Sequence, residues 1–269
     1  MQIPLLSIIF MFISAVVSIG TPVFLFIFFR RNFGARVLPL ILGIVVFVIF
    51  VLVLEAQVHK IVFARYALRE TPVLYVIYGI FMAGIFEETG RFIAFTILRR
   101  KYSGIGSGLS YGIGHGGAEA ILLAGITMLI IFVASILVNT GNIEIITGRF
   151  QGEALAAIQS QIENVSGAAP YMFLLSGIER LAAIAIQLSL SVMVFYAVYR
   201  RSKIWLYPLA IVFHAIIDIP AAAMQAGLLS NVLLVEGMVC LAAIAIVFFA
   251  IFLHRKLSYY LAPIGLAPF

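Results

Sequence analysis

Two adjacent glutamates, Glu87 and Glu88, lie in the stretch FEETGRF, inside an otherwise apolar segment of the sequence. A carboxylate can take a proton from water and so activate the water for attack on a carbonyl carbon. Arg91 follows Glu87 by four residues and Glu88 by three, so on a helix it can pair with either. Since a charge in a poor solvent needs a partner, we expect one glutamate to bind Arg91 and the other to face water or substrate.

Two histidines stand one helical turn before a carboxylate, again within apolar sequence. His115 precedes Glu119 by four residues, and His214 precedes Asp218, the only aspartate of the chain, by the same spacing. Residues four apart share a helix face, and a carboxylate beside an imidazole fixes the tautomer of the ring. These pairs therefore suit a general base or a metal ligand.

The composition is that of an integral membrane protein. The chain is 64% hydrophobic and 10% charged, with a mean hydropathy of +1.18, whereas soluble domains are about a quarter charged. Apolar runs of about 20 residues, enough to cross a bilayer core, recur along the whole length. We predict an all-α, polytopic membrane helix bundle that forms one domain over residues 1–269. About seven spans are predicted, at 4–29, 37–54, 72–98, 104–138, 171–199, 204–224 and 229–253.

The net charge of +6 does not indicate a nucleic-acid partner, because the basic residues sit at the ends of the predicted spans. An N-terminus outside and a C-terminus inside the cell places all of them on the cytoplasmic side, as the positive-inside rule requires. We expect a multi-pass protein of a prokaryotic plasma membrane, with an extracytoplasmic segment 139–170 that can hold a short interfacial helix. The basic groups are Arg30, Arg31 and Arg36; Arg99, Arg100 and Lys101; Arg200, Arg201 and Lys203; and Arg255 and Lys256.

The glutamate pair and the two histidines share one depth under this topology. The pair lies about eleven residues, roughly 17 Å, from the basic group that follows its span. His115 lies about eleven residues, again roughly 17 Å, and His214 about ten residues, roughly 15 Å, from the cytoplasmic ends of their spans. We therefore predict a site near the bilayer midplane, entered from the cytoplasmic half. The candidate core helices are 72–98, 104–138, 171–199 and 204–224.

Two further features of the spans favour structural roles. Glu179 and Arg180 lie about twenty residues from the cytoplasmic end of their helix, so we expect an ion pair in the outer half, with control of substrate access as the alternative. Glycines recur every four residues along one helix face, which lets a neighbouring backbone approach closely. This ladder predicts helix packing, with a groove for a substrate peptide as the alternative. It consists of Gly104, Gly108, Gly112 and Gly116.

The polar residues resemble the pattern of the glutamic-type intramembrane proteases, a superfamily that holds the CAAX prenyl proteases, the bacteriocin-processing relatives and PrsW. That pattern is a glutamate pair with a basic residue downstream, then an aromatic residue four before a histidine or glutamate, then a histidine four before an asparagine or aspartate. Over nearly the whole chain the sequence is similar to the YhfC family of this group. The matching residues are Glu87-Glu88-Thr89-Gly90-Arg91, Tyr111 with His115, and His214 with Asp218.

The resemblance implies an intramembrane endopeptidase that hydrolyses a membrane-associated or lipidated peptide with an activated water. It assigns water activation to Glu87 and pairing with Arg91 to Glu88, whereas helix spacing slightly favours the reverse, and both stay open. His214 and Asp218 would then donate hydrogen bonds to the developing oxyanion or position the base. The basic residue has the spacing of PrsW while His115 is typical of the CAAX proteases, so the pattern leaves the substrate class open.

Three other functions suit the same residues. Zinc held by His115, His214 and Glu88 would lower the pKa of a bound water to about 7, although no HExxH motif is present to require a metal. A proton-coupled transporter also places such groups at the midplane, with inverted repeats and broken helices. A scaffold without activity would keep the polar set for assembly only. No cysteine metal cluster or disulfide framework is expected from the single Cys240.

Overall fold

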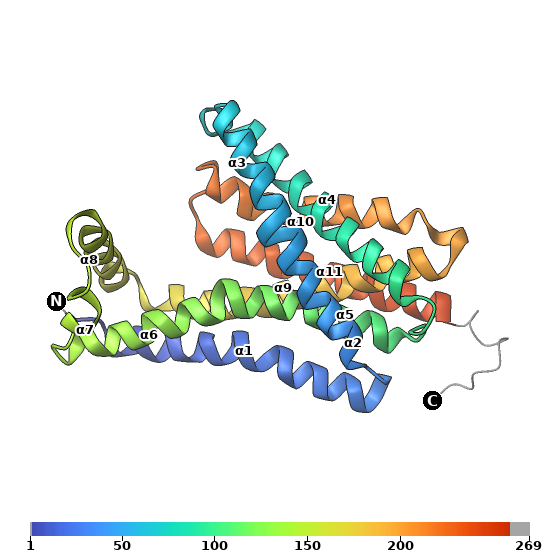
Figure 1. Cartoon of the computed structure of the whole chain (residues 1–269), viewed down its shortest axis with the longest axis horizontal. Coiled ribbons are helices and arrows are strands. Elements are labelled where there is room, and N and C mark those ends of the chain that lie inside the picture. The colour runs from blue at the N-terminus through green and yellow to red at the C-terminus, as the bar shows by residue number, and fades with distance from the viewer. Residues whose placement is uncertain (1, 259–269) are drawn as a thin grey trace. The chain divides into compact units, whose positions relative to one another are not determined.

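The chain is described by a computed structural model over residues 2–258, which contain helices and no strand. Seven helical runs there are long and apolar enough to cross a membrane, so the predicted all-α, multi-pass membrane architecture is confirmed (Figure 1). The elements are α1 Leu5–Phe33, α2 Val37–Phe47, η1 Val48–Glu55, α3 Ala56–Arg65, η2 Leu68–Glu70, α4 Pro72–Leu98, α5 Ile105–Glu119, η3 Ala120–Gly125, α6 Ile126–Asn139, α7 Glu144–Thr147, α8 Gly152–Gly167, α9 Pro170–Tyr199, η4 Arg201–Lys203, α10 Leu206–Gln225 and α11 Val232–Ser258.

Six of the predicted spans agree with the structure to within a few residues, and the second does not. The prediction ended it at residue 54, whereas α2, η1 and α3 continue as one helical run from Val37 to Arg65. The prediction was wrong because the charge of Glu55 was taken as the end of the apolar stretch. That residue is instead only 6% exposed.

The chain separates into two compact units, Met1–Thr21 with Glu119–Leu181, and Pro22–Ala118 with Ala182–Phe269. The second of these is the larger unit, and it holds the glutamate pair and both of the histidines singled out in the sequence. The prediction of a single domain over 1–269 stays a prediction, and residues 1 and 259–269 of that range lie outside the described part of the chain.

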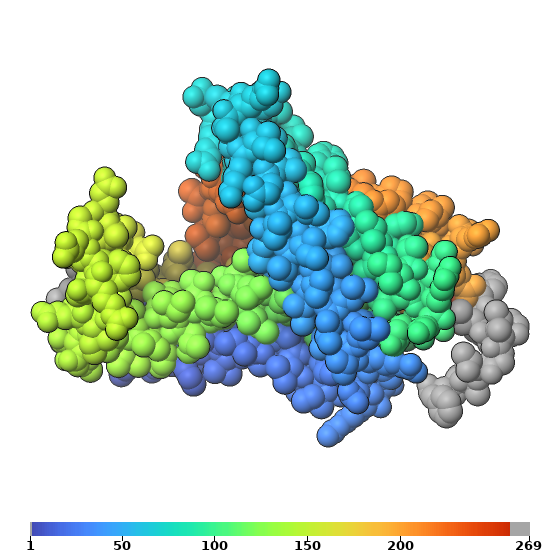
Figure 2. Space-filling model, in the orientation of Figure 1, coloured from blue at the N-terminus to red at the C-terminus, as the bar shows by residue number. Residues whose placement is uncertain are grey.

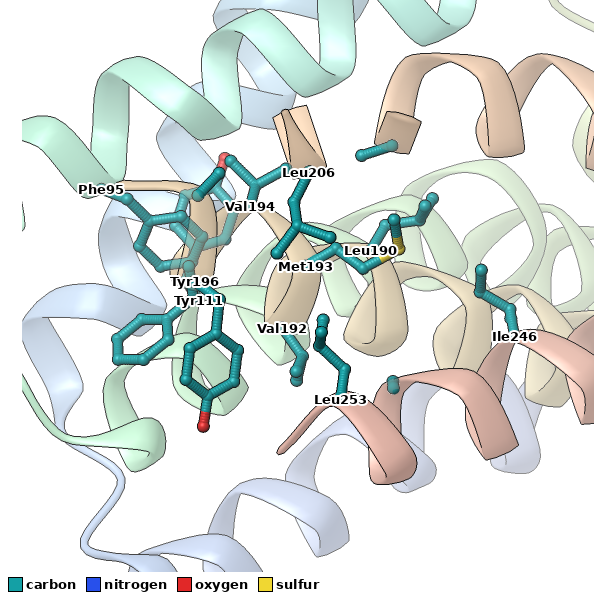
Figure 3. Close-up of a cluster of buried hydrophobic side chains, with 14 of the residues drawn as sticks. Phe95, Tyr111, Leu190, Val192, Met193, Val194, Tyr196, Leu206, Ile246 and Leu253 are labelled. Carbon is teal, nitrogen blue, oxygen red and sulfur yellow. The ribbon is translucent and has the colours of Figure 1, made fainter. Parts of the chain in front are cut away.

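The larger unit is built around the second half of α9. Almost every residue from Ala182 to Val198 is buried, as is typical of a helix that neighbours cover on all sides. Phe95 of α4 and Tyr111 of α5 pack with Leu190 and Tyr196 of this helix in one hydrophobic cluster (Figure 3). This packing fixes the positions of α4 and α5 relative to α9.

Close backbone packing holds α5 between two neighbours of the same unit. A Cβ added at Gly108, Gly112 or Gly116 would lie 3.2 Å or less from atoms of α9. Gly114, on another face, abuts the backbone of α2 at Leu40. The predicted packing role is confirmed for these three members of the glycine ladder, whereas a Cβ at Gly104 would meet no atom within 4 Å.

The smaller unit contains α6, α7, α8 and parts of α1 and α9. The Ile3 backbone N–H donates to Asn139 Oδ1 at 2.8 Å, and Asn139 Nδ2 donates back to the Ile3 carbonyl at 2.8 Å. Ile3 also joins Met11 and Phe173 in a hydrophobic cluster. The segment predicted to hold a short helix contains α8, over Gly152–Gly167, and the interfacial position of that helix stays a prediction.

Candidate active site

The glutamate pair of α4 is buried inside the larger unit, and its two members have different partners. Glu87 is 7% exposed, and both Glu88 and Arg91 are 0% exposed. Arg91 Nη1 donates to the two carboxylate oxygens of Glu88 at 2.6 and 2.7 Å. The structure therefore pairs the guanidinium with Glu88 and leaves Glu87 to other partners, as the family resemblance implied.

Glu87 lies among side chains of three other helices. Its Oε2 accepts a hydrogen bond from His115 Nε2 of α5 at 2.9 Å and from Gln187 Nε2 of α9 at 2.8 Å. His214 Nε2 of α10 lies 3.9 Å from the same oxygen. A carboxylate can only accept hydrogen bonds when ionised, so His115 carries its proton on Nε2 in this arrangement. The predicted convergence of α4, α5 and α10 on one layer is present.

His214 is oriented by the second glutamate. Its Nδ1 donates to Glu88 Oε1 at 2.8 Å, which turns Nε2 toward Asp218 Oδ2 at 3.4 Å. A carboxylate behind a histidine fixes the ring and its tautomer. The side chain of Asp218 is 37% exposed, whereas that of His214 is 5% exposed. Asp218 therefore marks the accessible edge of an otherwise buried site.

Gln187 is a member of the site that the sequence interpretation missed. Its Nε2 donates to Glu87, and its Oε1 accepts a hydrogen bond from Arg91 Nη2. The carboxamide thus connects the two glutamates through the arginine. A depth argument would have found it, since Gln187 lies about thirteen residues, roughly 20 Å, from Arg200 at the end of its span. The sequence interpretation missed it because only ionisable side chains were taken as candidates.

The ring of Tyr111 packs near the imidazole of His115. It is 0% exposed, and its ring centroid lies 4.9 Å from that of Phe95 and 6.0 Å from that of His115. Phe47 of α2 contacts the same imidazole edge-on at 5.2 Å. Two aromatic rings therefore restrict the orientation of His115 toward Glu87.

The remaining predicted supporting residues belong to the smaller unit. Arg180 Nη1 donates to Glu119 Oε1 at 3.1 Å, and Arg180 Nη2 forms an ion pair with Glu179. The expected ion pair of Glu179 and Arg180 is therefore present and includes a second glutamate. Arg180 is thus a partner of Glu119, which the sequence had paired by spacing with His115.

Comparison with known families agrees with this set of residues. A family model described as YhfC intramembrane metalloprotease matches residues 15–239. The chain belongs to the YhfC family. Every residue of the α4, α5, α9 and α10 site lies within the matched range. Membership supports a membrane protease and a location in the cell membrane.

A bacterial relative of the family covers most of the chain. It is the protein called "Uncharacterized membrane protein YhfC" of Bacillus subtilis (strain 168), which is 34% identical over 244 residues. The alignment covers 88% of this chain and 92% of the relative. No solved structure matches the chain.

The site residues fit a zinc ion in the kind of donor that they offer. His115 Nε2 and His214 Nε2 both lie near Glu87 Oε2, and two imidazoles with a carboxylate form a common open zinc site. Glu88 stands behind His214, as a supporting carboxylate does in such sites. Over residues 2–258, no group of three or more such side chains is arranged as a ligand set as it stands. The structure favours Glu87 as the carboxylate ligand, whereas the sequence had suggested Glu88.

Proposed function

We propose that the chain is an intramembrane endopeptidase in which Glu87 activates a water molecule for attack on a peptide bond. The observation that carries this proposal is the division of the glutamate pair. Glu88 is held by Arg91, whereas Glu87 accepts hydrogen bonds from His115 and Gln187 and lies next to His214. Preorganised donors around one carboxylate in a buried site are what water activation requires.

The reaction follows from these positions. Glu87 takes a proton from water while the water oxygen forms a bond to the carbonyl carbon, and the carbonyl electron pair moves to its oxygen. The tetrahedral intermediate then collapses, the C–N bond breaks, and the leaving nitrogen receives the proton held by Glu87. The products are a carboxyl group and an amine, and the carboxylate is restored.

His214 is placed to assist at the reacting carbonyl. Its Nδ1 is committed to Glu88, so Nε2 is the ring atom directed toward Glu87 and Asp218. A proton on Nε2 can be donated to the oxyanion, which stabilises the charge that develops there. Asp218 is the accessible neighbour of this nitrogen and would orient the ring and the approaching substrate. The substrate that suits a site at this depth is a membrane-embedded or lipidated peptide.

A zinc-dependent hydrolase is the second candidate, and it is supported by the kind of donor that His115, Glu87 and His214 offer, two imidazoles and a carboxylate. These residues would hold the ion, with Glu88 supporting His214. Zinc would supply a water acidified to a pKa of about 7 and polarise the carbonyl. The roles of Gln187 and Arg91 in holding the carboxylates are the same in both candidates.

The proposal is tested by comparing new protein N-termini in cells that produce the wild-type chain or the Glu87→Gln variant. Chemical labelling of N-termini in the membrane fraction, followed by mass spectrometry, works for a substrate of any identity. We expect a set of internal N-termini that is lost with Glu87→Gln and kept with Glu163→Gln, the same change on α8. Identical N-termini from wild type and Glu87→Gln, at equal protein levels, would refute proteolysis by this site.

A further inference from the structure

A third glutamate is buried in the larger unit, outside the set described above. Glu55 ends η1, a π-helical segment, and is 6% exposed, although Val53 and Leu54 beside it are 47% and 42% exposed. π-Helical turns redirect side chains and occur often at functional sites. A carboxylate inside a membrane span is expensive and needs a reason.

Glu55 begins a chain of polar contacts that leads toward the Arg65 end of α3. Its Oε1 lies 3.2 Å from His59 Nε2, and His59 Nδ1 lies 2.8 Å from the hydroxyl of Tyr78 on α4. The side chain of His59 is 32% exposed. The turn that follows Arg65 forms the cyan projection at the surface in Figure 2. We call Glu55, His59 and Tyr78 the polar chain.

The other end of the polar chain lies on a helical run that borders the water-activating site. Glu55 ends η1, which packs against α4, the helix that carries Glu87. Phe47, two turns earlier on the same helical run, contacts the ring of His115 at 5.2 Å. Glu55 Oε2 is buried and has no hydrogen-bond partner among residues 2–258. A buried carboxylate oxygen without a protein partner is satisfied at least cost by a water molecule, provided that other polar groups are near. His59 supplies such a group at 3.2 Å from the other oxygen of the same carboxylate.

A hydrolytic site in a membrane also needs a supply of water. Each cleavage consumes one water molecule, yet Glu87 and His115 are 7% and 0% exposed. Val53 and Leu54, which precede Glu55 on the same helical run, face outward and are apolar, so they offer water no hydrogen bonds. The polar chain joins the buried Glu55 to the partly exposed His59 through hydrogen-bonding groups.

We propose that Glu55, His59 and Tyr78 line the route by which water reaches Glu87 from the Arg65 end of α3. Under the predicted topology this end is extracytoplasmic, so water and substrate would arrive from opposite halves of the membrane. The route itself stands on the polar chain, and only the use of its water for peptide hydrolysis rests on the proposed function.

Cysteine accessibility tests the route without a substrate. Single cysteines are introduced on a Cys240→Ser background, the protein is placed in lipid nanodiscs, and a charged trimethylammonium methanethiosulfonate is added. The rate of labelling is measured from the mass of the intact protein. Glu55→Cys is compared with Leu54→Cys, and Tyr78→Cys with Ile77→Cys, because each control lies at the same depth on an exposed apolar face.

A water-lined position reacts faster than a lipid-facing one, because the reactive thiolate forms in water. We expect the Glu55→Cys and Tyr78→Cys variants to react at least about tenfold faster than their controls. Equal, slow labelling within both pairs, in protein that elutes as a single species, would overturn the route. If Glu55→Cys does not fold, the pair at 77 and 78 decides. Rapid labelling together with unchanged N-termini in the Glu87→Gln cells would keep the route and reject the protease.

Discussion

Gln187 Nε2 donates a 2.8 Å hydrogen bond to Glu87 Oε2 and so ties the most buried helix of the larger unit to the carboxylate proposed to activate water. The same carboxamide accepts a hydrogen bond from Arg91 through its oxygen. One neutral side chain therefore contacts Glu87 directly and Glu88 through Arg91. This contact makes Gln187 a positioning residue rather than a group that touches the reacting atoms.

Replacing Gln187 by leucine should lower both stability and cleavage. The change leaves a carboxylate oxygen and a guanidinium nitrogen buried without this partner, at a cost of about 1–3 kcal/mol or more because both groups are charged. Thermal unfolding in detergent measures the loss of stability. The amount of newly formed protein N-termini in the membrane fraction measures the loss of cleavage. Gln187→Asn, which keeps the amide on a shorter stem, should lose less of each. Equal loss in both variants would show that the amide itself does not matter.

Replacing Arg91 alone should lower the stability of the protein more than replacing Arg91 and Glu88 together. Arg91→Met removes the cation that neutralises the buried Glu88 and leaves that carboxylate with the hydrogen bond from His214, and breaking a buried pair typically costs about 3–5 kcal/mol. The double variant Arg91→Met/Glu88→Gln removes the charge as well and should recover part of that loss. A double-mutant cycle on thermal stability gives the coupling energy. Additive losses would contradict a specific Arg91–Glu88 interaction.

The packing of α5 predicts opposite effects for two glycine-to-alanine changes. A Cβ at Gly114 would collide with the backbone of α2, which cannot yield as a flexible side chain does, so we expect a loss of about 1–3 kcal/mol. Gly104→Ala meets no atom within 4 Å and should be neutral or stabilise by up to about 1 kcal/mol. The two melting temperatures, measured in the same detergent, provide the comparison. A larger loss at Gly104 than at Gly114 would be inconsistent with the observed packing.

Metal analysis separates the two candidate mechanisms. If Glu87 alone activates water, the purified protein should keep its cleavage activity after treatment with a strong chelator and should contain no stoichiometric zinc. The measurement is total metal per folded protein, for the wild type and for His115→Ala. One equivalent of zinc that disappears with His115→Ala would instead establish the metal-dependent mechanism, with His115 as a ligand.

Much of the architecture follows from the sequence because charge is rare in it. Isolated ionisable residues in apolar runs indicated the layer of Glu87, His115 and His214, and the basic groups at span ends set their depth. Helix spacing could not select Glu88 as the partner of Arg91, since separations of three and four residues both allow pairing. In the structure, Gln187 of α9 donates to Glu87 and accepts from Arg91, and this contact from a helix distant in sequence goes with the pairing of Arg91 and Glu88.

The second span shows where reasoning from the positions of charged residues fails. Charge was taken to mark the end of a membrane segment, and Glu55 therefore shortened the span. The residue is buried and contacts His59 one turn later. Nothing in the local sequence distinguishes a glutamate that ends a span from one that a neighbouring helix covers, so the error could be corrected only with the tertiary structure.

The glycine contacts of α5 also limit which parts of the molecule can move. With backbone atoms of α2 and side chains of α9 against its faces, α5 can neither slide nor rotate by a turn without steric collision. His115 is thus carried on a helix that is closely packed on two faces. If the proposed peptide substrate enters by displacement of a helix, α10 is the candidate, because it carries both His214 and the exposed Asp218. Its outward swing would separate His214 from Glu88, so that the catalytic set would be complete only after the helix returns over the substrate.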